Sequence, residues 1–256
     1  MTAKKNAQMD HGFDGISDKF AKNIYGTTKG QLRHALLCHH LSTLNLVNTP
    51  PKQILDSGCG LGQMAEFFAD AGHHVEGMDI SSESIAYAKQ QAQDKHLSID
   101  YSVGSLQSVT KQYDLIINHA VLEWLQEPFA AIELLLKQLV PGGHLSLSFF
   151  NKDALTFGNL IYGNFDYVKK GLKVKKKVRL NPQQPLSVQP VLSFINSLNN
   201  IEIIHQAGIR CIHDYMRDLS HQTTHYEALL DAEITYSTQP PYMWLGKYFH
   251  LVLRKV

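Results

Sequence analysis

The stretch Ile54-Leu55-Asp56-Ser57-Gly58-Cys59-Gly60-Leu61-Gly62, followed by Val75-Glu76-Gly77-Met78-Asp79, decides the fold of this chain. It is typical of a strand, a glycine turn and a second strand that ends in a carboxylate. Glycines let the backbone approach a ligand where a Cβ would collide, and an acid about twenty residues further along can accept hydrogen bonds from both ribose hydroxyls. The two stretches together predict a nucleoside-binding pocket.

The spacing of the glycines leaves two cofactor classes open. Gly60-Leu61-Gly62-Gln63-Met64-Ala65 satisfies the looser dinucleotide pattern, in which alanine replaces the last glycine. The longer pattern Asp56-x-Gly58-x-Gly60-x-Gly62 resembles the first motif of class I S-adenosylmethionine-dependent methyltransferases. S-adenosylmethionine carries no pyrophosphate, so the helix N-terminus need not bind an anion as it does for NAD. The longer pattern favours S-adenosylmethionine.

The composition predicts one globular α/β domain. The chain has 256 residues, of which 44% are apolar and 18% charged, and a chain of this length can bury most of its surface around one core. We expect an N-terminal helical segment at 1–50 as part of the same domain, and a cofactor-binding domain at 51–256 with a basic insertion at about 151–190.

Cysteine usage and the lack of long apolar runs indicate a cytoplasmic protein. Cys38, Cys59 and Cys211 are odd in number and widely spaced, which excludes a disulfide framework and a zinc CxxC pair. No apolar run follows the lysines at 1–6, and no apolar stretch reaches the roughly eighteen residues of a membrane span. Secretion and membrane insertion are therefore not expected.

Predicted strands and helices alternate along the chain. The expected strands are 53–56, 74–79, 99–103, 113–118, 144–150, 201–209 and 245–253, and the expected helices are 29–44, 63–71, 81–95, 128–139 and 223–236. This alternation predicts an α/β, doubly wound sheet. The methyltransferase resemblance implies seven strands in a Rossmann-like sheet, the last two forming an antiparallel hairpin at the edge. The basic, proline-broken stretch 158–190 is predicted to be a mobile insertion over the site.

Several residues near the glycine turn are candidates for cofactor binding. Asp79 lies where it can accept from both ribose hydroxyls, although a strand-end acid can also be merely exposed. Gly58, Cys59 and Gly60 should line the floor beneath the methionine portion. Asp56 should either receive the cofactor ammonium or hold the turn through backbone donors.

Two further candidates follow the third and fourth predicted strands. Gln107 lies where methyltransferases contact the adenine, but polar residues are common in loops without any ligand. His119 has the position that faces the transferable methyl in this fold, so it should touch cofactor or substrate. The alternative is a histidine hydrogen-bonded at a strand end.

The histidines do not predict a metal site. His221 and His225 have i, i+4 spacing, but Gln222 replaces the glutamate of the HExxH motif and no third ligand is evident. The adjacent histidines at 39–40 and 73–74 form no recognisable ligand pattern.

The basic charge is concentrated between Lys169 and Arg179, although the net charge is only +1. This run could neutralise phosphates, and the aromatic residues just before it, Tyr162, Phe165 and Tyr167, could stack on unpaired bases. A solvated charged loop is the alternative. The basic residues of the run are Lys169, Lys170, Lys173, Lys175, Lys176, Lys177 and Arg179.

Four segments resemble the bacterial tRNA methyltransferases that esterify 5-carboxymethoxyuridine at the anticodon wobble position, and the resemblance covers nearly the whole chain. The segments are 20–33 (FAKNIYGTTKGQLR), 119–124 (HAVLEW), 163–168 (GNFDYV) with the lysine run, and 226–230 (YEALL). The family can show three consecutive glycines where this chain has Gly58-Cys59-Gly60. The resemblance implies cofactor contacts from Arg33, Gly58, Cys59, Asp79, Leu106, Gln107 and His119.

The implied chemistry needs no strong general base, because a carboxylate with a pKa near 4 is already ionised and nucleophilic at neutral pH. The resemblance implies S-adenosylmethionine as donor, S-adenosylhomocysteine as product and the tRNA anticodon region as partner. We expect Tyr25 and either Arg210 or Arg217 to orient the acceptor carboxylate. A small-molecule carboxyl or quinone methyltransferase, a non-catalytic RNA-binding module and an NAD oxidoreductase remain as alternatives.

Overall fold

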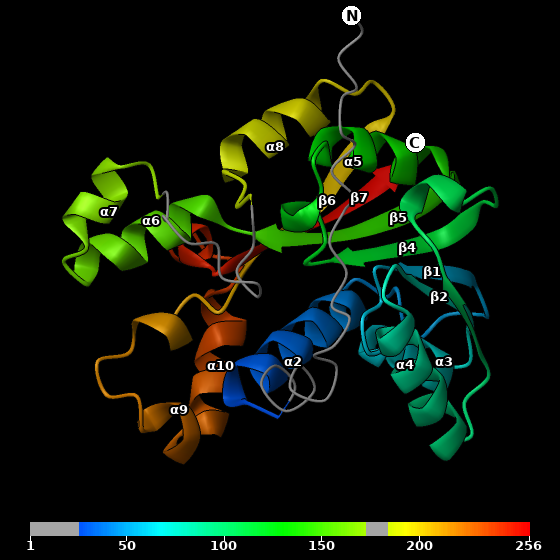
Figure 1. Cartoon of the computed structure of the whole chain (residues 1–256), viewed down its shortest axis with the longest axis horizontal. Helices are drawn as coiled ribbons and strands as arrows, with labels where there is room; N and C mark the ends of the chain where they lie inside the picture. Colours follow the sequence, from blue (N-terminus) through cyan, green and yellow to red (C-terminus); the bar gives the residue numbers. More distant parts are fainter. Residues whose placement is uncertain (1–25, 173–183) are drawn as a thin grey trace, which may run out of the picture.

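The computed structural model describes residues 26–172 and 184–256 and contains a seven-stranded sheet of order β3-β2-β1-β4-β5-β7-β6 (Figure 1). The strands are β1 (Gln53–Ser57), β2 (His74–Asp79), β3 (Ile99–Val103), β4 (Tyr113–His119), β5 (Leu139–Phe150), β6 (Ile201–Ile209) and β7 (Tyr248–Lys255). β1 to β5 pair in parallel, whereas β7 is antiparallel to both β5 and β6. The predicted Rossmann-like sheet with an antiparallel edge hairpin is confirmed.

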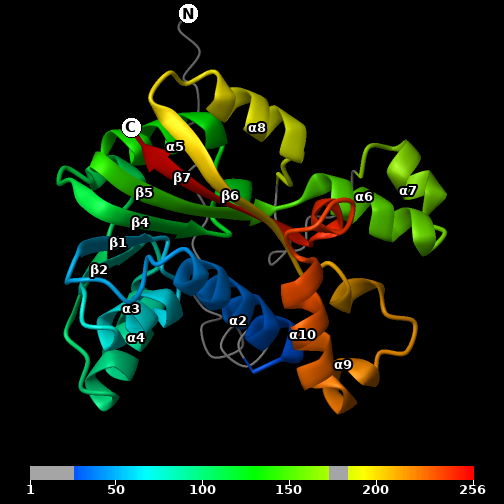
Figure 2. The same ribbon diagram turned by 180° about the vertical axis from the view of Figure 1, so that it is seen from behind.

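Helices cover both faces of the sheet (Figures 1 and 2). α5 and α8 lie on one face, and α2, α3 and α4 lie on the other, with α10 packed beside α2. The helices are α2 (Thr28–Thr43), α3 (Gln63–Asp70), α4 (Ser82–Asp94), α5 (Pro128–Lys137), α6 (Lys152–Ile161), α7 (Phe165–Lys169), α8 (Val188–Asn196), α9 (His221–Thr224) and α10 (Tyr226–Tyr236).

Each face of the sheet buries its own apolar cluster, which explains the continuous apolar run in β4. Leu115 and Ile117 belong to the cluster under α2, α3 and α4, and Ile116 belongs to the cluster under α5 and α8. A central parallel strand is buried on both faces, so successive apolar residues all find a core. β4 therefore contributes side chains to the cores beneath both helix layers.

Polar side chains cap the helices that enter the site region. The Thr27 hydroxyl accepts from Gly30 N–H at the start of α2, and the Ser81 hydroxyl accepts from Ser84 N–H at the start of α4. Each cap satisfies a backbone donor that has no partner inside its helix. The helix starting positions near the site are thus set by local sequence.

The described part of the predicted insertion 158–190 is largely helical, and its mobility stays a prediction. α6 and α7 occupy most of 152–169, and α8 begins at Val188. The Asn151 side chain caps α6 by accepting from Asp153 N–H at 2.9 Å, a start signal that the glycines and lysines further along obscured.

Three predicted boundaries also differ. The expected helix 223–236 is divided at His225 into α9 and α10. β5 begins at Leu139, before the Pro141-Gly142-Gly143 expected to precede the strand, and β7 begins at Tyr248 because Tyr242–Leu245 form the short helix η5.

All three cysteines are unpaired. Within 26–172 and 184–256, no helix is both long and apolar enough to cross a membrane.

Candidate functional site

The glycine turn joins β1 to α3 and is held by the end of β2. Gly58 N–H donates to Met78 O at 2.7 Å. Gly58 and Gly62 have φ values of +74° and +86°, in the left-handed region that favours glycine. A Cβ on Gly58 would collide with the Val121 side chain, and one on Gly62 with the Tyr101 hydroxyl. The carboxyl end of β1 therefore presents closely packed backbone, as a nucleoside pocket requires.

Asp79 lies beside this turn at the end of β2 and is buried. Its Oδ2 accepts from Gly60 N–H and its Oδ1 accepts from Ser81 N–H, both at 2.9 Å. Backbone donors from the turn and from the start of α4 thus fix the carboxylate between them. The structure places Asp79 where the sequence located it, and its contact with ribose stays a prediction.

Asp56 was predicted to receive the cofactor ammonium or to hold the glycine turn through backbone donors. Its Oδ2 accepts from Ala65 N–H at 3.1 Å, so the carboxyl holds the first turn of α3. Burial raises its pKa to about 7; the hydrogen bond from Ala65 N–H opposes this rise, and the nearby charge of Asp79 contributes to it. The backbone donor comes from α3, not from the glycine turn itself.

The Cys59 side chain is buried in the glycine turn. Burial raises the pKa of the Cys59 thiol well above its ordinary value, and the charges of Asp56 and Asp79 act in the same direction. A protonated buried thiol is a poor nucleophile. The departure from a run of three glycines therefore adds no reactive group to the turn.

The predicted adenine contacts lie on the short helix η2 (Leu106–Ser108) after β3. Leu106 is buried and Gln107 is exposed. Gly104 N–H donates to Asp79 O at 3.0 Å, which ties this loop to the end of β2. η2 and Asp79 therefore belong to one structural unit at the carboxyl edge of the sheet.

Helix α2 brings Arg33 to the end of β4. Arg33 Cζ lies 5.2 Å from the centroid of the Tyr248 ring, a cation–π contact. His119 is buried, and its Nε2 lies 2.7 Å from Ser146 Oγ, while its Nδ1 has no hydrogen-bond partner among the described residues. Burial, and then the positive charge of Arg33, lower the pKa of His119 to about 3. His119 is therefore neutral, and Arg33 lies close enough to influence it.

Glu123 is a buried acid that the sequence analysis did not single out. It is 1% exposed, and neither carboxylate oxygen makes a hydrogen bond of standard geometry within the described chain. Burial raises its pKa to about 7, although the backbone N–H groups of Glu123 and Phe150 and the charge of Arg33 lower it. An acid inside an otherwise apolar string, Val121-Leu122-Glu123-Trp124, was the available signal.

Cations gather around Tyr248 and Phe150, where β5, β6 and β7 meet at the carboxyl edge. Arg210 Cζ lies 5.9 Å from the Tyr248 ring centroid, on which Arg33 also packs, and Lys247 Nζ lies 5.3 Å from the Phe150 ring centroid. Burial lowers the pKa of Lys247. The sequence analysis missed Lys247, because its neighbours come from distant parts of the chain.

Arg210 is already engaged by an acid. Its Nε and Nη2 donate to Asp214 Oδ2 and Oδ1, both at 2.7 Å. Burial alone would raise the pKa of Asp214, but hydrogen bonds from His213 and Arg210 outweigh it and hold the pKa well below its usual range. Since one bidentate pair occupies the Arg210 fork, a second carboxylate would have to compete with Asp214.

Of the other two residues expected to orient the acceptor, the structure describes only Arg217. Arg217 is exposed, in the loop before α9. Tyr25 lies outside the described residues, as do Lys173, Lys175, Lys176, Lys177 and Arg179 of the basic run.

The described start of the basic run lies on a protruding lobe formed by α6 and α7 (Figure 1). Lys169 and Lys170 are exposed at the end of α7. Tyr162 and Phe165 on the same lobe are 69% and 65% exposed, so they do not pack into the core. Tyr167 is half-buried.

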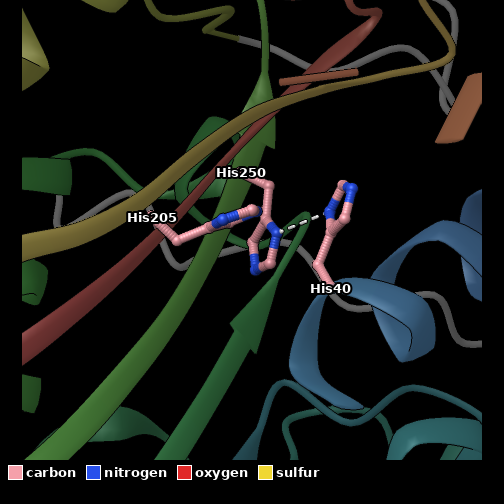
Figure 3. Close-up of side chains that lie close together, drawn as sticks. All are labelled: His40, His205 and His250. Carbon is pink, nitrogen blue, oxygen red and sulfur yellow. Dashed lines mark hydrogen bonds between the residues drawn. The ribbon is translucent and has the colours of Figure 1, made fainter. Parts of the chain in front are cut away.

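The fold gathers three histidines that no spacing rule could connect. His40 of α2, His205 of β6 and His250 of β7 have ring nitrogens within 4.8 Å of one another (Figure 3). The sequence predicted no metal constellation, because these residues are far apart along the chain. His221 and His225 are exposed, with ring centroids 4.5 Å apart.

Comparison with known proteins identifies close relatives. Residues 55–147 match the family model described as a methyltransferase domain. The chain is 41% identical, over 96% of its length and 97% of the relative, to the tRNA 5-carboxymethoxyuridine methyltransferase of Escherichia coli (strain K12). A ubiquinone biosynthesis O-methyltransferase of Nitrobacter winogradskyi is 34% identical but matches only 41% of each chain. The similarity to the quinone enzyme is thus confined to part of the chain.

Solved structures support the same fold. The magnesium protoporphyrin IX methyltransferase from Synechocystis PCC 6803 with bound S-adenosylhomocysteine superposes with a TM-score of 0.65, at 18% identity, over 95% of this chain and 96% of that one. A [4+2]-cyclase also superposes, with a TM-score of 0.57, at 20% identity, over 86% of this chain and 80% of that one. Because the fold also supports a cyclase, the fold alone does not decide the reaction.

Proposed function

Since this chain belongs to the family of tRNA 5-carboxymethoxyuridine methyltransferases, we infer that it transfers a methyl group from S-adenosylmethionine to the carboxylate of 5-carboxymethoxyuridine in tRNA, giving the methyl ester. The observation that carries this function is similarity across the whole chain, not only across the cofactor half. The quinone methyltransferases match less than half of it.

The residues at the carboxyl ends of β1, β2 and β4 fit S-adenosylmethionine. The glycine turn packs closely, because a Cβ on Gly58 or Gly62 would collide with Val121 or Tyr101, and Asp79 supplies a fixed carboxylate for the ribose hydroxyls. Arg33 would pair bidentately with the cofactor carboxylate, and the unpartnered Nδ1 of His119 supplies a buried acceptor. The full proposed set is Arg33, Asp56, Gly58, Cys59, Gly60, Asp79, Leu106, Gln107 and His119.

The cofactor, when bound, supplies an electrophilic methyl group on sulfonium. The protein's own task is to bring an ionised carboxylate oxygen into line with that group, so no residue need remove a proton. We place the acceptor carboxylate beside Lys247, because its positive charge lies against the Phe150 ring at the carboxyl end of β5, next to Tyr248, while Arg33 is taken by the cofactor carboxylate. Lys247 is less firmly engaged than Arg210, which Asp214 holds bidentately. Arg217 and Tyr25 remain further candidates.

The α6–α7 lobe would bind the anticodon region of tRNA. Lys169 and Lys170 offer charge for the phosphates, and the exposed rings of Tyr162 and Phe165 offer faces on which unpaired bases stack. We extend this surface to Lys173, Lys175, Lys176, Lys177 and Arg179, and we place the enzyme in the cytoplasm with its tRNA substrate. The helical segment at 1–50 would form part of the same domain as 51–256.

Mass spectrometry of tRNA nucleosides tests this function. Cells lacking the protein should accumulate unesterified 5-carboxymethoxyuridine and lose the methyl ester, and expression of the wild-type chain should restore it. A variant carrying Asp79→Asn should fail to restore the ester. A normal ester level in cells without the protein would contradict the substrate assignment.

A further inference from the structure

A row of buried polar side chains crosses the sheet face beneath α2. His119 Nε2 lies 2.7 Å from Ser146 Oγ, which lies 2.9 Å from His250 Nε2. His250 Nδ1 lies 3.4 Å from His40 Nδ1, a contact drawn as the dashed line in Figure 3, and His40 Nε2 lies 3.0 Å from Ser237 Oγ. We call this chain of contacts the histidine relay. It connects the end of β4 to the end of α10 through β5, β7 and α2.

The hydrogen bonds of Ser237, at the α10 end of the relay, decide which atoms donate and which accept. The Ser237 hydroxyl donates to Ile234 O at 3.0 Å, in the last turn of α10, where carbonyls lack helical partners. A hydroxyl has one proton, so His40 Nε2 must donate to Ser237 Oγ. A neutral imidazole has one N–H, and His40 Nδ1 is therefore an acceptor.

The contact between His40 and His250 has the same donor-to-acceptor direction and extends the relay to β7. The His40 and His250 rings lie within 11° of one another, and their centroids are 5.6 Å apart while the nitrogens are 3.4 Å apart. The rings therefore meet edge to edge, as a hydrogen bond requires, and not face to face. His250 Nδ1–H donates to His40, so His250 Nε2 accepts from the Ser146 hydroxyl. Ser146 Oγ must then accept from His119 Nε2–H.

Burial keeps the imidazoles of the relay neutral. The assignment of donors and acceptors requires this, because it assumes one N–H on each ring. Burial lowers the pKa of His40 and of His119 to about 3, and it lowers that of His250 well below its ordinary value. Arg33 and His34 of α2 and His250 of β7 face His119, and the positive charge of Arg33 further disfavours a cationic His119 ring. His39 and His205 act on His40 in the same way.

We propose that the histidine relay holds His119 as the Nε2–H tautomer, so that its Nδ1 presents a lone pair to the cofactor ammonium. The Nδ1 atom is buried and has no partner within the described residues, so a ligand donor is what it lacks. A lone pair at this point also repels a carboxylate. His119 thus favours the cofactor and leaves the acceptor carboxylate to the cations around Tyr248. This role for the ammonium rests on the proposed function.

The relay geometry does not favour a metal site. His40 and His250 aim their Nδ1 atoms at each other, so these lone pairs do not converge on one point. His205 lies beside them, with ring centroids 4.7 Å from His40 and 5.5 Å from His250. A metal ion bound through both Nδ1 atoms would remove the hydrogen bond between them and reverse the tautomer of His250.

Nitrogen-15 NMR of the ligand-free protein tests the tautomer without relying on the proposed function, with the His119 signal assigned by its loss in His119→Gln. We expect His119 to show a protonated Nε2 and an unprotonated Nδ1, and Ser146→Ala to give a mixture of tautomers. A protonated Nδ1 in the wild-type protein would overturn the proposal. So would stoichiometric zinc that survives dialysis against a chelator.

Calorimetry with S-adenosylmethionine tests the consequence for binding. Ser146→Ala should weaken the affinity about tenfold, the size expected when a hydrogen bond to a charged group is misaligned, and Ser146→Thr should largely restore it. The matched control is Ser148→Ala, which removes a buried hydroxyl from the same strand that has no partner in the described chain. Equal losses in Ser146→Ala and Ser148→Ala would refute the relay. Failure of the folded wild-type protein to bind would instead refute the proposed function.

Discussion

The two halves of the sheet build their parts of the site in different ways. The half formed by β1, β2 and β3 relies on backbone: Gly60 N–H donates to Asp79, and Gly58 N–H donates to Met78 O. The half formed by β5, β6 and β7 relies on long side chains. Arg33 and Arg210 are far apart in the sequence, but both pack on the Tyr248 ring. We propose that the first half binds the cofactor and that the second half binds the acceptor.

The largest effect should follow from Asp79→Asn in the first half. The carboxylate holds Gly60 N–H and Ser81 N–H and is proposed to bind ribose, and hydrogen bonds to charged groups are each worth about 1.5–3 kcal/mol. We expect the affinity for S-adenosylmethionine to fall at least about a hundredfold by calorimetry. Asp100→Asn, at an exposed position on β3, is the control and should bind normally. Unchanged affinity in Asp79→Asn would remove the first half from the cofactor site.

The next effect concerns the buried acid at the boundary between the halves, Glu123. Its pKa is about 7 in the folded protein against an ordinary 4.5, so between these values the unfolded chain loses a proton that the folded chain keeps. Stability therefore falls as the pH rises through this window and stays reduced above it. Glu123→Gln removes this cost.

Urea unfolding measures the effect of Glu123→Gln. At pH 8 the variant should be more stable than the wild type by an amount on the order of 2–3 kcal/mol, and near pH 4 the two should be alike. Asp56 contributes equally to both proteins, so the difference isolates Glu123. The exposed Glu127→Gln is the control. A stability difference independent of pH would mean that Glu123 is ionised when folded.

A smaller effect should separate the second half from the first. Lys247→Met keeps the length of the side chain but removes the charge, so we expect kcat/KM for the tRNA to fall about tenfold, in line with one charged hydrogen bond. The affinity for S-adenosylmethionine should stay unchanged. Lys137→Met, at an exposed position at the end of α5, is the control. If cofactor affinity fell together with kcat/KM, the two halves would not act separately.

The smallest effect is expected at the rim of the cofactor pocket. Gln107 is exposed on η2, so the contact proposed between its side chain and the adenine would be solvent-accessible. Gln107→Ala should weaken S-adenosylmethionine binding only a few-fold, as expected for one exposed neutral hydrogen bond. Gln93→Ala, exposed near the end of α4, should have no effect. A loss as large as that in Asp79→Asn would show that η2 anchors the cofactor.

The same comparison explains which parts of the fold could be predicted. β1, the turn and β2 follow one another closely, so residue spacing alone located Asp56 and Asp79 at one edge of the sheet. α6 and α7 could not be predicted, because Gly158, Gly163 and the lysines are typical of a loop. Their order depends on contacts such as that between the Asn151 side chain and Trp244 O, 93 positions away.

The candidate site also contains residues that the sequence pattern alone could not indicate. Arg33 was found only through the family resemblance, since nothing near it in sequence indicates that α2 reaches the end of β4. Lys247 and Glu123 were missed because burial and neighbouring charges, which give them their character, arise only when the hairpin closes on the sheet. The histidine relay was equally hidden, because His40 and His250 are 210 positions apart.

The most direct test is a methyl-transfer assay with labelled S-adenosylmethionine and tRNA that carries 5-carboxymethoxyuridine. The methyl group should enter the tRNA and then leave as methanol in mild alkali, because an ester hydrolyses under conditions in which methyl groups on nitrogen, carbon or ether oxygen stay bound. Matched tRNA lacking the carboxymethoxy group should accept no label. Label that resists alkali, or label entering the unmodified tRNA equally, would contradict carboxyl methylation by this protein.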